Sequence, residues 1–329
     1  MTKISYNSKL SEKIIIDKFF KKLNLNKAGT YNFENDGAYF NIARKNQTIV
    51  TTDTIIEGID FFSNDPPESI AQKIICVNLS DISAMGAIPK TYTLNLSINS
   101  KINYEWLKKF TSKLYKLQKK YNIYLLGGDI SNAKQISLTT NLFGESKFKN
   151  IIAQKKCNLD DDIWVTGTLG NSYLGCKILK NSNLKLDKKY SSYFIKQYLY
   201  PNPCMFGSKA CKYINSAIDI SDGFLGDLSK ILDGKFGARI NKNLIPVSVK
   251  LKKILKKKYS IIKLEDILNW GDDYELIFTS FKKNRQKLLS LSKKNKVKLS
   301  LVGSIIKKPG IFNDSLKVIK NIHSYDHFA

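Results

Sequence analysis

The sequence predicts an α/β protein of the α+β type, divided into two domains. Its 329 residues exceed the usual length of a single domain. In the first half, apolar strands stand both next to one another and on either side of long amphipathic helices, so the order is not a strict βαβ repeat. A polar, lysine-bearing stretch at 145–162 separates the halves and predicts domains of residues 1–150 and 151–329.

Local patterns predict the elements of the first half. Asp65 and Pro66 are typical of a helix start, because an N-cap residue is followed by proline, and Gly86 is a natural stop. A short polar turn at 44–47 joins two apolar segments into a hairpin, and a Gly-Gly pair at 127–128 ends another strand. The expected elements are helix 11–23, strands 38–43 and 48–52, a helix from 65, strand 92–98, helix 104–121, and strands 123–126 and 136–143.

The second half alternates helical and extended patterns in the same way. The expected elements are strand 163–166, helices 171–179 and 190–199, strand 216–220, helix 223–232, strands 238–241 and 274–279, a further helix, and strand 299–302.

The formal net charge of +26, from 54 basic and 28 acidic residues, invites a nucleic-acid interpretation. In the segment 106–120, however, apolar residues recur at helical spacing and lysines occupy the remaining face. No platform of interleaved aromatic residues accompanies the charge. We therefore predict solvated helix faces and no nucleic-acid partner.

Several function classes are excluded by composition. No run of about 18 apolar residues is present, so we expect no membrane span, and the N-terminus lacks a secretory h-region. The five cysteines form no CxxC pair and the chain has only two histidines, so we expect no zinc site. These features predict a reduced, cytoplasmic setting.

The scarce carboxylates carry the chemical signal. Many are flanked by Gly, Ser, Thr or Asn at expected element ends, which leaves room for a hydrated Mg²⁺ ion and phosphate groups. With a turn near Lys45, the hairpin places Asp36 about opposite Asp53, a like-charge pair that a cation would stabilise. The aspartates in this context are Asp36, Asp53, Asp81, Asp129, Asp219, Asp222, Asp272 and Asp273.

Taken singly, each aspartate also fits an Asx turn or a helix cap. Asp222 fits a cap of the helix expected from Gly223, and Asp81 fits a solvent-facing helix position. Other nucleotide-binding motifs are absent: the segment 170–177 comes nearest to a P-loop, but its lysine is one place late. The recurrence of the pattern in a lysine-rich chain favours a shared metal–phosphate site.

Seven segments together resemble the thiamine-monophosphate kinase family in order and spacing. They are TTDTIIEG (51–58), VNLSDISAMGA (77–87), LLGGD (125–129), WVTGTLGNS (164–172), AIDISDGFLGDL (217–228), GDDYELIF (271–278) and SYDHF (324–328). The resemblance covers nearly the whole chain from about residue 12. It implies an aminoimidazole ribonucleotide synthetase-like fold, with an N-terminal mixed sheet and helices, a C-terminal α/β sandwich, and a homodimer built through the N-terminal sheets.

The resemblance also implies a reaction. The phosphate of thiamine monophosphate would attack the γ-phosphate of ATP, giving thiamine diphosphate and ADP with the help of several Mg²⁺ ions. The N-terminal domain would bind metal and ATP, and the C-terminal domain would complete the active site. Because a phosphate monoester is largely ionised at pH 7, no side chain is expected to act as a general base.

Site residues follow from the resemblance, position by position. The metal ligands would be Asp36, Thr51, Thr52, Asp53, Asp81, Asp129, Asp219 and Asp222; ATP would be bound by Gly128, Asp129, Gln154 and Ser221, and the substrate by Asp60, Asp272 and Tyr325. Asp60, Gln154 and Asp272 replace a histidine, an arginine and a glutamate of the family. Loss of the arginine removes a bidentate phosphate contact, for which Lys155 or Lys156 could substitute.

Two alternatives remain open from the sequence. The changes at Asp60 and Asp272 fit another ATP-dependent enzyme of the same superfamily, acting on a different small substrate. The second alternative is a non-catalytic protein that binds thiamine phosphates or, through its lysines, nucleic acid.

Overall fold

The computed structural model describes residues 12–27, 30, 40–43, 46–146, 151–181, 184, 186–256 and 262–325. The chain forms two compact units, which interleave along the sequence. The first comprises Met1–Ala43, Val50–Asn78 and Pro89–Gly144, and the second comprises Arg44–Ile49, Leu79–Ile88 and Glu145–Ala329. The domain boundary near residue 150 stays a prediction.

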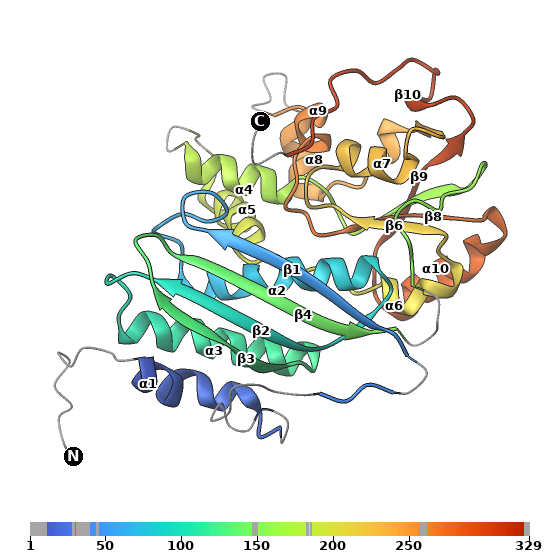
Figure 1. Ribbon diagram of the computed structural model, residues 1–329. Helices are drawn as coiled ribbons and strands as arrows, with labels where there is room; N and C mark the ends of the chain where they lie inside the picture. The colour runs from blue at the N-terminus through green and yellow to red at the C-terminus, as the bar shows by residue number, and fades with distance from the viewer. Residues whose placement is uncertain are drawn as a thin grey trace. The chain divides into compact units, whose positions relative to one another are not determined.

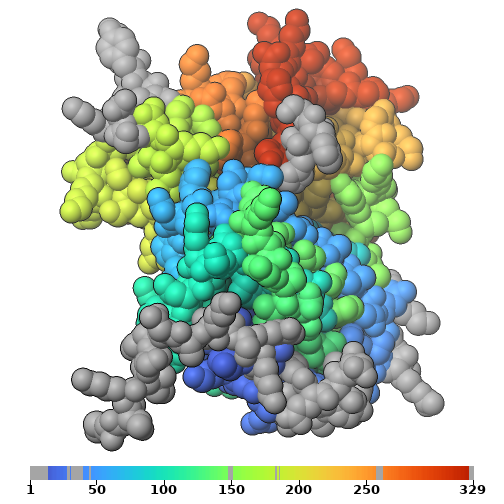
Figure 2. Space-filling model, turned by 60° about the vertical axis from the view of Figure 1, so that its left-hand side comes forward, coloured from blue at the N-terminus to red at the C-terminus, as the bar shows by residue number. Residues whose placement is uncertain are grey.

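The first unit is a four-stranded sheet in the order β1-β4-β2-β3, and helices α2 and α3 lie on one face of it (Figure 1). Tyr92 and Leu94 of the sheet and Phe110 and Leu114 of α3 are buried and form part of its core. Light blue, teal and green segments of this unit make up a continuous stretch of the surface in Figure 2. The elements are α1 (Glu12–Ile15), η1 (Ile16–Phe20), η2 (Lys21–Asn24), β1 (Thr48–Ile56), α2 (Pro67–Ala84), β2 (Ile88–Ile98), α3 (Tyr104–Tyr121), β3 (Tyr124–Asn132) and β4 (Ser137–Glu145).

Helix α3 confirms the prediction made for 104–121 at both ends. The side chain of Asn103 caps the first turn by accepting the Trp106 N–H at 2.9 Å, and Asn122 ends the helix in the left-handed region at φ 54°. Buried apolar side chains occupy one face, while Lys108 and most other lysines of the helix are exposed. The basic stripe is therefore a solvated helix face, as predicted.

Two predictions in the first unit are wrong. The strand expected to end at Leu126 continues as β3 to Asn132, because it pairs in parallel with β2 through Gly127 and Gly128, with an irregularity after Tyr92. Residues 40–43 are not assigned to a strand, while the rest of the expected segment 38–43 and its turn falls largely outside the described residues. Asp36 also lies outside them, so the predicted pair with Asp53 is untested.

The second unit is a six-stranded mixed sheet in the order β10-β7-β9-β5-β8-β6, covered on both faces. Along β5, Ile163 and Val165 pack into one core with α4, α5, α7, α8 and α9, and Trp164 packs into another with α6 and α10. This layering confirms the α/β sandwich. The strands are β5 (Asp162–Thr166), β6 (Ser216–Asp219), β7 (Gly237–Ile240), β8 (Leu276–Ser280), β9 (Leu299–Ile306) and β10 (Gly310–Asn313).

The helices of the second unit include three that the sequence did not predict, α6, α8 and α9. They are α4 (Asn171–Lys180), α5 (Lys188–Leu199), α6 (Gly207–Ala210), α7 (Phe224–Leu232), α8 (Val249–Leu255), α9 (Leu264–Leu268) and α10 (Arg285–Lys294), with short 3₁₀ turns at Cys211–Tyr213, Lys242–Leu244 and Lys282–Asn284. In the described ranges, no helix combines the length and apolar character needed to cross a membrane.

Candidate active site

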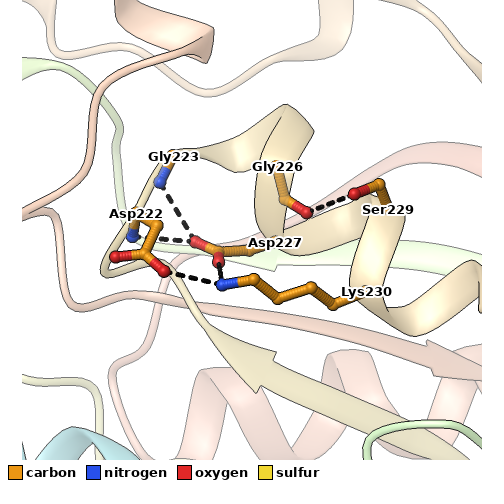
Figure 3. A network of polar contacts seen from close by, with 6 residues as sticks. All are labelled: Asp222, Gly223, Gly226, Asp227, Ser229 and Lys230. Carbon is orange, nitrogen blue, oxygen red and sulfur yellow. Dashed lines mark hydrogen bonds and ion pairs between the residues drawn. The ribbon is translucent and has the colours of Figure 1, made fainter. Parts of the chain in front are cut away.

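The loop between β6 and α7 in the second unit holds a compact network of charged groups (Figure 3). The backbone N–H groups of Asp222 and Gly223 both donate to Oδ2 of Asp227 at 3.1 Å. Lys230 donates from Nζ to Oδ2 of Asp222 at 2.6 Å and to Oδ1 of Asp227 at 2.8 Å. Asp227 therefore fixes the backbone of the loop, and Lys230 fixes the carboxylate of Asp222.

The local sequence explains this arrangement. Gly223, at φ 125°, turns the chain from β6 into α7 in a conformation that side-chain-bearing residues rarely adopt. Asp227 reaches back from the first turn of α7 to the N–H groups before it, and Lys230 follows one turn later on the same face. Asp222 does not cap the helix through its side chain, so that simple interpretation of Asp222 is wrong.

The charges in this network perturb one another. Burial raises the pKa of Asp227, although the Lys230 ammonium opposes the rise. Burial alone would lower the pKa of Lys230, but hydrogen bonds to Asp222 and Asp227 outweigh it and raise that pKa. The lysine therefore stays charged and neutralises part of the loop.

A second loop, residues 271–275, lies directly against the first. The Asp272 N–H donates to the Ser221 carbonyl oxygen at 3.0 Å, and the Tyr274 N–H donates to the Ile220 carbonyl oxygen at 3.0 Å. A Cβ atom added at Gly271 would stand 1.6 Å from the Ser221 oxygen, so only glycine allows this approach. Asp272 has a φ of 60°, and its Oδ1 accepts the Tyr274 hydroxyl at 2.7 Å.

The C-terminal segment adds the third side of the site. The Tyr325 N–H donates to the Asp222 carbonyl oxygen at 3.3 Å, and the His323 N–H donates to Oδ1 of Asn269 at 2.9 Å. The Tyr325 residue remains 53% exposed. Three separate segments of the chain thus bring together four residues predicted from the sequence: Ser221, Asp222, Asp272 and Tyr325.

Two largely buried carboxylates hold the second loop in place. Asp273 accepts the Gly170 N–H on both oxygens, at 3.0 and 2.9 Å, and the Ser172 hydroxyl at 3.0 Å. Glu275 accepts the Thr166 hydroxyl at 2.6 Å. Burial raises the pKa of Asp273 well above its usual range and that of Glu275 to about 7. These groups bind the backbone of Gly170 and the hydroxyl groups of Thr166 and Ser172.

The predicted metal ligands of the first unit that the structure describes lie within strands and not at strand ends. Thr51 and Asp53 are inside β1, and the Thr51 hydroxyl donates to Oδ1 of Asn78 in α2 at 3.0 Å. Thr52 is exposed on the other face of the strand. Asp129 is exposed within β3 and stands opposite Asn95 in the register. The expectation that small residues mark strand ends is wrong here, because the glycines and threonines continue the ladders.

Close backbone packing explains the glycine preceding Asp129. A Cβ atom at Gly128 would stand 1.9 Å from the carbonyl oxygen of Leu94, whereas one at Gly127 would meet no atom within 4 Å. Gly128 is thus required by the β2–β3 pairing, whether or not nucleotide approaches it.

The remaining predicted residues have local partners. Oδ2 of Asp60 accepts the Ile56 N–H at 2.7 Å, which closes the turn after β1. The Gln154 carbonyl oxygen accepts the Ser216 hydroxyl at the start of β6. Asp219 stands at the other end of that strand, about 10 Å away. Asp81 lies near the end of α2 and is partly buried.

Comparison with known proteins identifies the family. A thiamine-monophosphate kinase of Buchnera aphidicola subsp. Acyrthosiphon pisum is 37% identical over 97% of this chain and 99% of its own. The chain belongs to the thiamine-monophosphate kinase family. The AIR synthase related protein N-terminal domain family matches residues 34–145.

Solved structures of thiamine-monophosphate kinases share the fold. The enzyme from Stenotrophomonas maltophilia K279a superposes with a TM-score of 0.82 at 28% identity, covering 93% of this chain and 96% of that one. AaThiL complexed with AMPPCP and TMP gives 0.77 at 26% identity, covering 98% and 100%. The resemblance to this kinase family and the fold class that it implied are confirmed.

The ligand atoms predicted for this member of the thiamine-monophosphate kinase family suit a hard cation. The side chains predicted as ligands offer carboxylate and hydroxyl oxygens, which Mg²⁺ prefers. Within the described part of the chain, no three His, Cys, Asp or Glu side chains lie close enough together to hold a metal ion by themselves. Mg²⁺ commonly takes one or two carboxylates and completes its shell with water and substrate phosphate, so the residues fit.

Sequence reasoning missed Asp227 and Lys230 as parts of the site. Asp227 sits in the first turn of α7, where an acidic residue often bonds back to preceding N–H groups, and that spacing could have indicated it. Lys230 carries no such signal among 54 basic residues.

Proposed function

We propose that this chain transfers the γ-phosphate of ATP to thiamine monophosphate, forming thiamine diphosphate and ADP in the presence of Mg²⁺. The observation that carries the proposal is the meeting of Ser221, Asp222, Asp272 and Tyr325 through backbone hydrogen bonds. Members of the family named thiamine-monophosphate kinase match nearly the whole chain, and AaThiL has been solved with AMPPCP, an ATP analogue, and TMP.

The proposed roles divide between the three segments. Ser221 would bind ATP, and Asp219 and Asp222 would hold Mg²⁺. Asp272 and Tyr325 would bind thiamine monophosphate, with the Tyr274 hydroxyl orienting Oδ1 of Asp272. Bound Mg²⁺ would neutralise phosphate charge and allow two polyanions to approach in line.

The substrate phosphate serves as its own nucleophile in this proposal. Its second ionisation has a pKa of about 6, so it is mainly a dianion at pH 7 and no side chain has to remove a proton. The work of the chain is to hold donor and acceptor in one geometry, to which rigid backbone contacts between the loops contribute.

The remaining predicted ligands extend the same proposal. Thr51, Thr52, Asp53, Asp81, Asp129 and Asp36 would add metal contacts, and Gly128, Gln154 and Asp60 would add contacts to ATP and substrate. Asp60 already closes a turn through its carboxylate, so we assign it a supporting role in loop shape as well.

We also propose a homodimer formed through the sheet of the first unit. Helices α2 and α3 cover one face of the sheet (Figure 1), and hydroxyl groups are joined across its strands. These contacts include Thr54 with Thr139 at 2.8 Å and Ser97 with Ser131 at 2.9 Å. Val50 is 58% exposed. Such a face suits a second copy of the same sheet, and all five free cysteines fit the cytoplasmic location that we propose.

The test is product formation by the purified protein. Incubation with ATP, Mg²⁺ and thiamine monophosphate should yield thiamine diphosphate and ADP in equal amounts, separated by chromatography. Replacing thiamine monophosphate by other small phosphate or carboxylate acceptors should release little ADP. If ADP forms only with a different acceptor, the alternative superfamily enzyme is correct; if no acceptor is used, the chain is a binder.

A further inference from the structure

Lys230 is the cation of the β6–α7 loop network, and the proposed function leaves it without a role. Its ammonium group lies 2.6 Å from Asp222 and 2.8 Å from Asp227, so it contacts a proposed metal ligand and a structural carboxylate together. Figure 3 shows the lysine side chain extending along α7 toward both groups.

The position of Lys230 is set by groups that cannot easily move. Asp227 has no exposed side-chain surface, and its other oxygen is held by two backbone N–H groups. A buried carboxylate is costly without a partner, so the ammonium group is kept beside it. Asp222 is more accessible, with 31% of its side chain exposed. The ion pair with Asp222 is thus the one that can open or share its carboxylate.

We propose that Lys230 is a positioning residue that serves as an internal counter-ion for Asp222 and weakens the binding of divalent cations there. This inference rests on the proposed function, in which Asp222 holds Mg²⁺. Lys230 maintains the loop when no divalent cation is bound, and it competes with the cation for the same carboxylate.

The charges give the direction of the effect. Asp222 and Asp227 carry two negative charges, and Lys230 reduces their sum to one. Figure 3 shows the second oxygen of Asp222 pointing away from Lys230, so a divalent cation that binds that oxygen is still repelled by the ammonium group. At a separation of about 5 Å, removing this repulsion strengthens cation binding roughly tenfold even at the dielectric constant of water.

The first comparison uses three lysine variants and the wild-type protein. Lys230→Met removes the charge and keeps an apolar stem, and Lys230→Arg keeps the charge. Lys242→Met is the matched control, because Lys242 forms an ion pair of 2.7 Å with Glu265, outside the network of Asp222. For each protein, Mn²⁺ is titrated in the presence of AMPPCP, and free Mn²⁺ is followed by electron paramagnetic resonance.

We expect Lys230→Met to lower the apparent Kd for Mn²⁺ by threefold to tenfold, while Lys230→Arg and Lys242→Met stay within twofold of wild type. The thermal unfolding midpoint in EDTA should fall in Lys230→Met, and saturating Mn²⁺ should restore more of it than in wild type. Asp222→Asn should weaken Mn²⁺ binding, because the cation loses the carboxylate that it shares with Lys230.

An unchanged or weaker Mn²⁺ affinity in Lys230→Met overturns the inference, as does an equal gain in Lys242→Met. If Lys230→Met does not fold, Lys230→Gln, which removes the charge but keeps a hydrogen-bond donor, takes its place with the same expected gain in Mn²⁺ affinity. Thiamine diphosphate formation by the wild-type protein tests the proposed function separately, so a failure there is distinguished from a failure of this inference.

Discussion

The backbone N–H of Asp272 donates to the carbonyl oxygen of Ser221 at 3.0 Å. Ser221 was predicted on the ATP side of the site and Asp272 on the substrate side, some fifty positions apart in the chain. One peptide hydrogen bond therefore couples the two sides. In the proposed function, a displacement of either loop would change the distance between the γ-phosphate of ATP and the phosphate of thiamine monophosphate. The residues that hold these loops in place therefore matter as much as the side chains that would contact ligand.

Asp273 tests the anchoring of the second loop. In Asp273→Ala, the buried Gly170 N–H loses its acceptor and the Ser172 hydroxyl keeps only the Gly271 carbonyl oxygen, which should cost about 2–3 kcal/mol of unfolding free energy and raise KM for thiamine monophosphate. Asp273→Asn keeps an oxygen at the Oδ1 position and should lose less than about 1 kcal/mol. Urea unfolding and steady-state kinetics measure both effects. Equal losses in the two variants would refute the hydrogen-bond account.

The glycine pair of β3 offers a comparison at adjacent positions. Gly128→Ala would place a Cβ atom 1.9 Å from the Leu94 carbonyl oxygen and should destabilise the protein by about 2 kcal/mol or more, because backbone must move. Gly127→Ala meets no atom within 4 Å and should cost less than about 1 kcal/mol. Thermal unfolding of both variants decides the matter; similar midpoints would show that the close approach is not required.

Glu275 predicts a pH dependence of stability. Its pKa is raised by burial from 4.5 to about 7, so the folded protein retains a proton that the unfolded chain loses between these values. The contribution of Glu275 to stability is therefore greatest below pH 4.5, falls by up to about 3 kcal/mol as pH rises to about 7, and levels off above it. The raised pKa of Asp273 acts in the same direction.

Unfolding in urea at pH 4 to 8 measures this dependence. Glu275→Gln should flatten the decline, whereas Glu105→Gln, which alters an exposed glutamate, should leave it unchanged. If wild type and Glu275→Gln follow the same slope, Glu275 does not carry the proton.

The ion pair between Arg285 and Asp162 predicts a stability effect that does not involve the loops of the candidate site. Asp162 has 1% of its side chain exposed and receives Nε and Nη2 of Arg285 at 2.5 and 2.7 Å. Arg285→Met leaves this carboxylate uncompensated and should cost about 2–4 kcal/mol, the lower part of the range reflecting partial exposure of the arginine. Lys282→Met removes an exposed pair with Asp160 and should cost under about 0.5 kcal/mol. Equal unfolding midpoints would contradict the account.

Much of the fold follows from local patterns in the sequence. Helix α3 was predictable to the residue because amphipathic spacing and asparagine caps at both ends agree. β3 was cut short at Leu126 because glycine usually weakens a strand, while the parallel pairing with β2 that extends it is a tertiary contact. α8 and α9, with seven and five residues, are too short to stand out from their surroundings and depend on packing.

Site residues that lie in sequence motifs were predictable, whereas the contacts between separate loops were not. The aspartates and Ser221 could be identified from their small neighbours and from the spacing of the family motifs, and Tyr325 could be identified from the C-terminal motif. The pairing of Ser221 with Asp272 and of Asp222 with Lys230 depends on how loops meet in space. The alternative interpretation of Asp222 as a helix cap is wrong because Gly223 is the N-cap residue and the carboxylate of Asp222 pairs with Lys230.

The most direct test of the central claim follows the transferred phosphate itself. ATP labelled at the γ-phosphate is incubated with Mg²⁺, thiamine monophosphate and either wild-type protein, Asp81→Asn or Asp222→Asn. The account predicts that wild type moves the label one-for-one into thiamine diphosphate, and that both variants, still folded by circular dichroism, transfer it at least about a hundredfold more slowly. Label appearing only as inorganic phosphate, or no transfer by the wild-type protein, would contradict it.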